Sequence, residues 1–141
     1  MKALSLLQPW ATLVVMGLKT IETRSWTTGY RGPLLIHAST GRAGALLAAE
    51  PPFTRHIHSF AALPFGALLG IVNLDEIVPV ESLAGTGISL RRLTLEEKAF
   101  GDDTAGRWGW ILSGARAFDK PIPMRGSLGL WTYSGPLPDI D

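Results

Sequence analysis

The sequence predicts an α+β fold, a mixed β-barrel of five to six strands with helices inserted between them. The 141 residues fit one domain, and a chain of this length buries enough surface to fold without a disulfide or a metal. Short apolar segments typical of strands recur at irregular spacing, which favours a mixed barrel over a regularly alternating, doubly wound sheet. We expect residues 1–133 to form the domain and residues 134–141, which include two prolines, to form a loose tail.

Residues 1–62 are predicted to contain three strands and three helices. The expected strands are Ala3–Leu6, Thr20–Trp26 and Pro33–Ala38, and the expected helices are Gln8–Gly17, Gly41–Glu50 and Phe53–Ala62. In the first helix, Pro9 suits the first turn, and Gly17 suits the left-handed position after the last turn. Trp10, Leu13 and Val14 share one face of this helix and should enter the core. The second helix is rich in alanine and leucine, and the two prolines that follow should end it.

The rest of the chain is predicted to hold three further strands, a short helix and a turn. The expected strands are Ala67–Val80, Arg107–Phe118 and Leu128–Tyr133, the helix lies near Thr94–Phe100, and the turn covers Lys120–Gly126. The middle strand alternates, so that Trp108, Trp110 and Leu112 share one face, while Arg107, Gly109 and Ile111 share the other. The turn is predicted because proline and glycine are frequent in that segment.

The composition excludes several kinds of function. No cysteine is present, which excludes disulfides, thiolate zinc sites and cysteine nucleophiles. The N-terminus lacks the apolar stretch and cleavage site of a signal peptide, and no apolar run reaches the ~18 residues that span a bilayer. We therefore expect a cytoplasmic protein without membrane association. His56 and His58 lie close in sequence, but the sequence suggests no third ligand, so no metal or cofactor is predicted.

The charge is distributed unevenly, although the net charge is only +1. Residues 1–60 carry six basic and two acidic side chains, and residues 61–141 carry seven basic and ten acidic ones, so the two parts have net charges of +4 and −3. Such asymmetry is typical of a protein that binds an anionic partner on one side. Random variation along a sequence also produces it.

The stretch GLKTIETRSWTTGYR concentrates the candidate binding residues. Alternate residues of a strand share a face, which predicts that Thr20, Glu22, Arg24 and Trp26 lie together, with Lys19 at the strand's beginning. Arginine forks onto a phosphate or a base edge, tryptophan stacks on a base, and lysine adds a point charge. Glu22 can accept a hydrogen bond from an exocyclic amine or carry a proton. The alternative interpretation is a solvated salt bridge worth about 0–1 kcal/mol beside a core tryptophan.

Further candidates for the same site follow in the sequence. Arg31 closes the stretch described above, and His37 ends an apolar strand, where it can hydrogen-bond a base or shuttle a proton. Ser39 lies where this strand gives way to a helix, whose free N–H groups can hold a phosphate. Arg125 follows a turn and is expected to approach the site from the far end of the barrel. Structural alternatives are a partly buried histidine, a helix cap and an exposed loop charge.

Several segments, taken in order, resemble the ASCH (activating signal cointegrator homology) domain, especially its single-domain bacterial and phage members. They are L-S-L-x-Q-P-W, G-x-K-x-x-E-x-R-S-W, Y-R-G-P-L-L-I-H-A, LPFGALLGIVNLDEIV, GRWGWILSGARAF and PIPMRGSLGLW, and they span most of residues 3–131. The resemblance implies a PUA-like β-barrel with an RNA-binding cleft beside the first helix. It places the lysine, acidic and arginine positions of the motif on Lys19, Glu22 and Arg24. Some ASCH proteins deacylate N4-acetylcytidine or cleave RNA, but the deacylases have a threonine where this chain has Glu22.

We therefore expect the chain to bind RNA, as a single strand or a modified nucleotide, in a basic cleft. The alternative is a hydrolase that acts on a modified nucleoside or on RNA, with Lys19 and Glu22 as proton carriers. A third interpretation is a protein-interaction module, which would present a large exposed apolar patch instead of a charged cleft. The sequence leaves the oligomeric state open.

Overall fold

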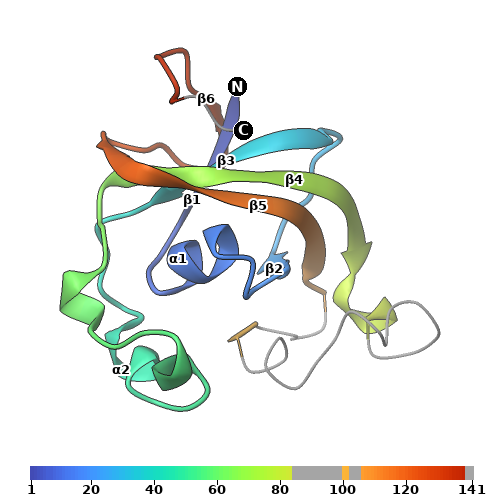
Figure 1. Ribbon diagram of the computed structural model, residues 1–141. Helices are drawn as coiled ribbons and strands as arrows, with labels where there is room; N and C mark the ends of the chain where they lie inside the picture. The colour runs from blue at the N-terminus through green and yellow to red at the C-terminus, as the bar shows by residue number, and fades with distance from the viewer. Residues whose placement is uncertain (84–99, 102–105, 139–141) are drawn as a thin grey trace.

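The centre of the protein is a six-stranded mixed sheet in the order β2-β5-β4-β3-β1-β6. The computed structural model describes residues 1–83, 100–101 and 106–138. The strands are β1 Lys2–Leu6, β2 Ile21–Arg24, β3 Gly32–Ala38, β4 Ala67–Pro79, β5 Trp108–Pro123 and β6 Leu130–Thr132. β1 and β3 run parallel, and the other neighbouring pairs are antiparallel. The sheet curls into a half-barrel over the helix α1 (Trp10–Val15), as Figure 1 shows.

This arrangement confirms the predicted α+β class and the presence of a strand in each expected segment. β2 is shorter than the predicted Thr20–Trp26, however, so Thr20 and Trp26 lie outside the strand. The short helix expected near Thr94–Phe100 lies outside the described residues, apart from Phe100. Within the described part of the chain, no helix is both long and apolar enough to cross a membrane.

The helix α1 is shorter than the predicted range of Gln8–Gly17. Gln8 lies before the helix, and its buried side chain hydrogen-bonds to the first turn, where its Oε1 accepts from the backbone N–H of Thr12 at 3.0 Å. Its Nε2 donates to the carbonyl of Pro64 at 2.8 Å. Gly17 adopts φ +75° after the last turn, as predicted. A glycine suits this position because the left-handed conformation disfavours any residue with a Cβ.

The prediction of two helices after β3, over Gly41–Glu50 and Phe53–Ala62, is largely wrong. Only Ala45–Ala48 (α2) is α-helical, and two 3-10 turns, η1 (Phe53–Arg55) and η2 (Phe60–Ala62), replace the second helix. One reason is tertiary: a Cβ added at Gly44 would lie 2.1 Å from the carbonyl oxygen of Gln8, so the backbone is held by close packing there. Apolar packing also fixes the η1 region, where Phe53 and Ile57 are buried in a small cluster with Leu13.

The turn predicted over Lys120–Gly126 is also wrong, because β5 continues to Pro123 and pairs with β4 along almost its whole length. β2 pairs only with residues 108–111, so the later part of β5 has an edge on that side that no strand among the described residues covers. A free edge tolerates proline, which cannot donate a backbone hydrogen bond. Register shifts interrupt the β4–β5 ladder, and Gly70 lies at one of them, where an added Cβ would be 2.3 Å from the carbonyl oxygen of Arg116.

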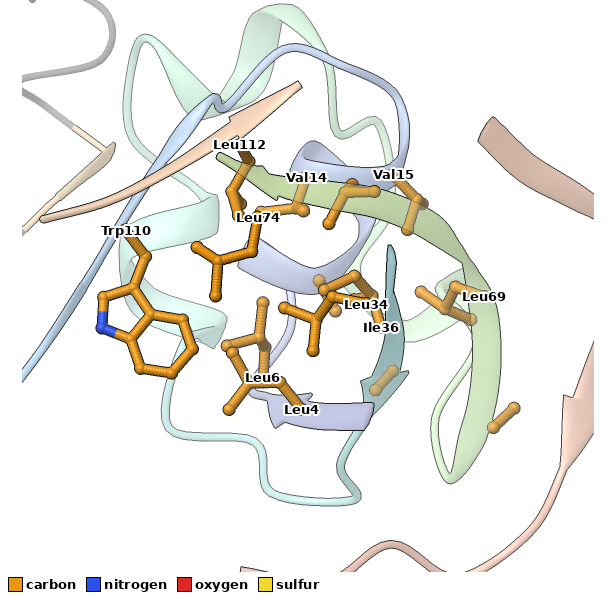
Figure 2. Packing of buried hydrophobic residues seen from close by; sticks show 14 residues of the cluster. Leu4, Leu6, Val14, Val15, Leu34, Ile36, Leu69, Leu74, Trp110 and Leu112 are labelled. Carbon is orange, nitrogen blue, oxygen red and sulfur yellow. The ribbon is translucent and has the colours of Figure 1, made fainter. Parts of the chain in front are cut away.

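The main hydrophobic core fills the space between α1 and the concave face of the sheet. Figure 2 shows side chains from β1, β3, β4, β5 and α1 meeting there, among them Leu6, Val14, Ile36, Leu74 and Trp110. The predicted alternation in β5 is confirmed. Trp110 and Leu112 enter this core, whereas Ile111 points to a second cluster with Ile21 and Leu83.

Two hydrogen bonds hold the beginning of β5 near η3 (Val80–Ser82). The backbone N–H of Val80 donates to the carbonyl of Arg107 at 3.1 Å, and the N–H of Gly106 donates to Oε1 of Glu81 at 2.7 Å. The bond from Gly106 lowers the pKa of the Glu81 carboxyl below its usual value. Arg107 is therefore held in place at the start of β5.

Trp110 is 0% exposed, so its removal leaves a large cavity in the core. We expect Trp110→Ala to lower the free energy of unfolding by about 3–5 kcal/mol, measured by urea denaturation with far-UV circular dichroism. Leu128→Ala is the control, because Leu128 is 98% exposed and its loss should change stability by less than about 0.5 kcal/mol. A loss below about 1 kcal/mol for Trp110→Ala would contradict this account of the core.

Candidate functional site

The candidate residues divide mainly between two hollows that lie on opposite faces of the sheet. The first, which we call the α1 cleft, has a volume of about 260 Å³ and is lined by Leu6, Leu7, Trp10, Glu22, Thr23, Arg24, Leu47, Phe100, Gly101 and Arg107. The second, which we call the β3 pocket, has a volume of about 580 Å³ and is lined by Ser5, His37, Ser39, Thr40, Gly66, Met124, Arg125, Gly126, Ser127 and Leu128. Successive residues of β1 point to opposite faces, so the sheet separates the two hollows.

Two charged side chains, of Glu22 and Arg24, line one wall of the α1 cleft, and Lys19 lies behind them. The side chain of Lys19 is 1% exposed, and its Nζ lies 3.7 Å from Oε1 of Glu22 and donates to the carbonyl of Ile21. On the other side, Nη1 of Arg24 donates to Oε2 of Glu22 at 3.3 Å. The side chains of Glu22 and Arg24 are 10% and 27% exposed, respectively. The Glu22 carboxylate is therefore held between a buried ammonium and a guanidinium that reaches the cleft.

Trp26 supports this wall but does not line the cleft. The guanidinium of Arg24 lies 5.9 Å from the centre of the Trp26 ring, within the range of a cation–π contact. The Trp26 ring packs edge-on against Trp110 with ring centres 4.9 Å apart, and Nε1 of Trp110 donates to the Trp26 carbonyl at 3.3 Å. The contacts connect Arg24 through Trp26 to the hydrophobic core.

Two hydrogen bonds at the cleft join residues that are far apart in the sequence. Nε1 of Trp10, at the start of α1, donates to the carbonyl of Phe100 at 2.7 Å. Nη2 of Arg107 donates to the carbonyl of Thr23 at 2.8 Å, which joins the beginning of β5 to β2. Arg107 was not among the predicted site residues. No local pattern could have identified it, because the antiparallel pairing of β2 with β5 places it there.

The other residues of the predicted stretch lie elsewhere. Thr20 precedes β2 and lines, together with Lys19, a smaller hollow of about 130 Å³ between α1 and the β4–β5 sheet. Arg31 is exposed, and its Nη1 donates to the carbonyls of Thr28 and Tyr30 at 2.7 Å each. The structure thus brings Lys19, Glu22, Arg24 and Trp26 into one connected set, and it leaves Thr20 and Arg31 outside the α1 cleft.

His37, Ser39 and Arg125 all belong to the β3 pocket. His37 is 2% exposed, and its Nε2 lies 2.8 Å from the carbonyl oxygen of Met124. A carbonyl only accepts, so Nε2 carries a proton and donates to it, while Nδ1 lies within hydrogen-bonding distance of the Ser5 hydroxyl oxygen, at 3.1 Å. Nε1 of Trp131 donates to the same hydroxyl oxygen at 3.2 Å. Both ring nitrogens of His37 are therefore engaged within the protein, and the ring joins β1, β3 and the segment after β5.

No group of three or more histidine, aspartate or glutamate side chains that could hold a metal ion occurs among the residues that the structure describes. The polar lining of the two hollows includes three guanidiniums, several hydroxyls, one carboxylate and the imidazole of His37. These groups are suited to hydrogen-bonding an anionic or amide-bearing organic ligand.

Curated relatives match part of the chain. Over 77 residues, or 50% of the chain, the sequence is 39% identical to activating signal cointegrator 1 of Mus musculus and 38% identical to activating signal cointegrator 1 of Homo sapiens. The chain spans only 13% of the length of each of these two relatives.

Crystal structures of the ASCH protein of Zymomonas mobilis share the fold. The protein itself and its tyrosine-to-phenylalanine and serine-to-alanine variants superpose with TM-scores of 0.52, 0.53 and 0.54 at 17%, 19% and 20% identity. The superpositions cover 86%, 86% and 87% of this chain and 72%, 74% and 73% of the others. The family model of the ASCH domain matches residues 4–121, which is most of the chain, and the chain therefore belongs to the ASCH domain family.

Proposed function

We propose that the chain binds RNA through the α1 cleft, which takes one base of a single strand or a modified nucleotide. The observation that carries the proposal is the buried position of Glu22 between Lys19 and Arg24, in the wall of a hollow that Arg107 also lines. Membership of the ASCH family, which is associated with RNA binding, supports the same function.

The charge of the cleft suits an anionic polymer. Two guanidiniums, of Arg24 and Arg107, and one carboxylate, of Glu22, line it. The buried ammonium of Lys19 offsets this carboxylate from behind, so the cleft with its wall carries a positive net charge. Arginines that contact phosphates release counterions from the nucleic acid, which makes the affinity dependent on salt.

The size and lining of the cleft suit a single base. Its volume of about 260 Å³ lies just below the ~300–1,000 Å³ of drug-sized ligand sites, so it has no room for a longer stretch of strand. Trp10 is partly exposed and provides aromatic surface, on which a base stacks. The fixed carboxylate of Glu22 can accept a hydrogen bond from an exocyclic amine, as carboxylates do from cytosine N4.

A second candidate function, hydrolysis of a modified nucleoside or of RNA, rests on the same ion pair. Glu22 lines the cleft, where 10% of its side chain is exposed, so its carboxylate can exchange a proton with a bound substrate. Lys19 lies behind Glu22 and does not line the cleft, so in this arrangement it serves as the buried counter-charge of the proton carrier.

Arg24→Gln should weaken the binding of a short single-stranded RNA about tenfold or more and lower the slope of log affinity against log salt by about one. The reason is the loss of one guanidinium from the cleft. Fluorescence anisotropy at several salt concentrations measures both quantities. Lys120→Gln removes the same charge from an exposed position on β5 outside the cleft and serves as the control. Equal losses for the two variants, or no RNA binding by the unaltered chain at low salt, would refute the proposed site.

Glu22→Gln should lower the free energy of unfolding by about 3–5 kcal/mol, because it leaves the ammonium of Lys19 buried without a carboxylate. Lys19→Met should lower the free energy of unfolding by less, since the Glu22 carboxylate keeps its ion pair with Arg24 and its contact with the solvent in the cleft. The double variant should therefore be more stable than Glu22→Gln alone. Urea denaturation of the four proteins measures this cycle, and strictly additive effects would show that the two groups do not interact.

Turnover distinguishes hydrolysis from simple binding. If the chain is a hydrolase, N4-acetylcytidine or RNA is cleaved on incubation, and Glu22→Gln slows the reaction at least about 100-fold through loss of the proton carrier. Chromatography of the products, with and without a divalent metal ion, provides the measurement. Cleavage that persists in Glu22→Gln would exclude Glu22 as the catalytic group, and no cleavage by the unaltered chain would leave RNA binding as the function.

A further inference from the structure

The β3 pocket has the dimensions of a separate small-molecule site. Its volume of about 580 Å³ falls within the ~300–1,000 Å³ typical of such sites. Ser5 lines this pocket, whereas the next residue, Leu6, enters the main core and lines the α1 cleft on the other face. A ligand in the β3 pocket therefore does not depend on RNA binding in the α1 cleft.

The floor of this pocket is held together by contacts within the protein. The ring of His37 is held by the hydroxyl of Ser5 on one side and the carbonyl of Met124 on the other. The ring of Trp131 packs edge-on against His37 with centres 5.7 Å apart. Met124 in turn donates its N–H to the carbonyl of Gly66 at 2.9 Å, which ties the far wall to the start of β4.

Gly126 lets the segment that carries Arg125 lie directly on this floor. A Cβ added at Gly126 would be 2.5 Å from both Nδ1 of His37 and Oγ of Ser5, which is closer than real contacts allow. Because Gly126 has no side chain, the backbone of this segment can lie close to His37 and Ser5, and this close approach fixes the position of the neighbouring residues Arg125 and Ser127. A site whose walls are fixed in this way loses little entropy on binding.

The groups that face the pocket suit a phosphate. Arg125 supplies a guanidinium fork, and Thr40 and Ser127 are exposed residues with hydroxyl donors. No carboxylate lines the pocket, and within the described ranges of the chain no carboxylate lies in ion-pair contact with Arg125. A guanidinium and two hydroxyls match the three terminal oxygens of a phosphomonoester.

The remaining lining suits an apolar ring attached to that phosphate. Met124 and Leu128 both line the pocket, and Leu128 is 98% exposed, more than any other large hydrophobic residue among those described. Inorganic phosphate alone would leave this apolar surface in water and most of the volume empty. The side chain of Leu128 gains a partner only if the ligand extends beyond the phosphate.

We propose that the β3 pocket binds the phosphomonoester of a nucleotide, either free or at the 5′ end of an RNA. Arg125 contacts the phosphate, Thr40 and Ser127 donate to its other oxygens, and Met124 and Leu128 cover the nucleoside. His37 and Ser5 are positioning residues that hold the wall and do not touch the ligand.

The test follows the backbone amide signals of the unaltered chain by NMR during titration with cytidine 5′-monophosphate. The signals of Thr40, Gly126 and Ser127 should shift and saturate. Cytidine and inorganic phosphate should bind there about tenfold or more weakly, because each lacks one half of the ligand. Arg125→Gln should weaken the nucleotide about tenfold or more, Arg125→Lys should restore part of the affinity, and Lys120→Gln should leave it unchanged.

The same signals distinguish the two sources of the phosphate. A 5′-phosphorylated trinucleotide that binds more tightly than both the mononucleotide and the 5′-hydroxyl trinucleotide identifies an RNA end, and equal affinity of the mononucleotide identifies a free nucleotide. Arg24→Gln should leave these shifts unchanged, so the result for the β3 pocket does not depend on whether the α1 cleft binds RNA. The proposal is overturned if cytidine or inorganic phosphate binds as tightly as the nucleotide, if Arg125→Gln has no effect, or if the pocket signals do not move.

Discussion

The pairing of the short strand β2 with the beginning of β5 is the constraint on which the rest of the structure depends. Glu22 and Arg24 lie opposite Trp110 and Trp108 in this ladder. The pairing closes the half-barrel over α1, so that Trp110 is buried in the core that Figure 2 shows. It also brings Arg107 beside Thr23 and so builds the charged side of the α1 cleft. One ladder thus connects the stability of the fold to the chemistry of the site.

A buried lysine next to a glutamate costs desolvation energy that an apolar pair would not. The chain nevertheless places Lys19 in the interior and points its ammonium at Glu22. The arrangement fixes the carboxylate at the edge of a hollow, with its second oxygen on Arg24. A carboxylate that is immobile and charge-compensated presents an acceptor with a defined direction, which is the property that recognition of a base edge requires.

The two hollows differ in how they are built. The α1 cleft is small, bordered by aromatic rings and by side chains already engaged with one another, which suits one base. The β3 pocket is larger, and its polar floor is satisfied internally by His37 and Ser5, while Arg125 is left to face solvent. Because the sheet lies between them, a ligand on one face need not exclude a ligand on the other.

The sequence by itself determined the α+β class, the alternation in β5, the left-handed Gly17 and the family motif on Lys19, Glu22 and Arg24. These features follow from local periodicity and backbone preference, which act between neighbours in the chain. Only the tertiary structure decided that β5 continues to Pro123, that Arg107 enters the cleft and that His37, Ser39 and Arg125 form a separate pocket. Each of these depends on which distant segments pair, and pairing is set by burial of the whole sheet, which no local pattern contains.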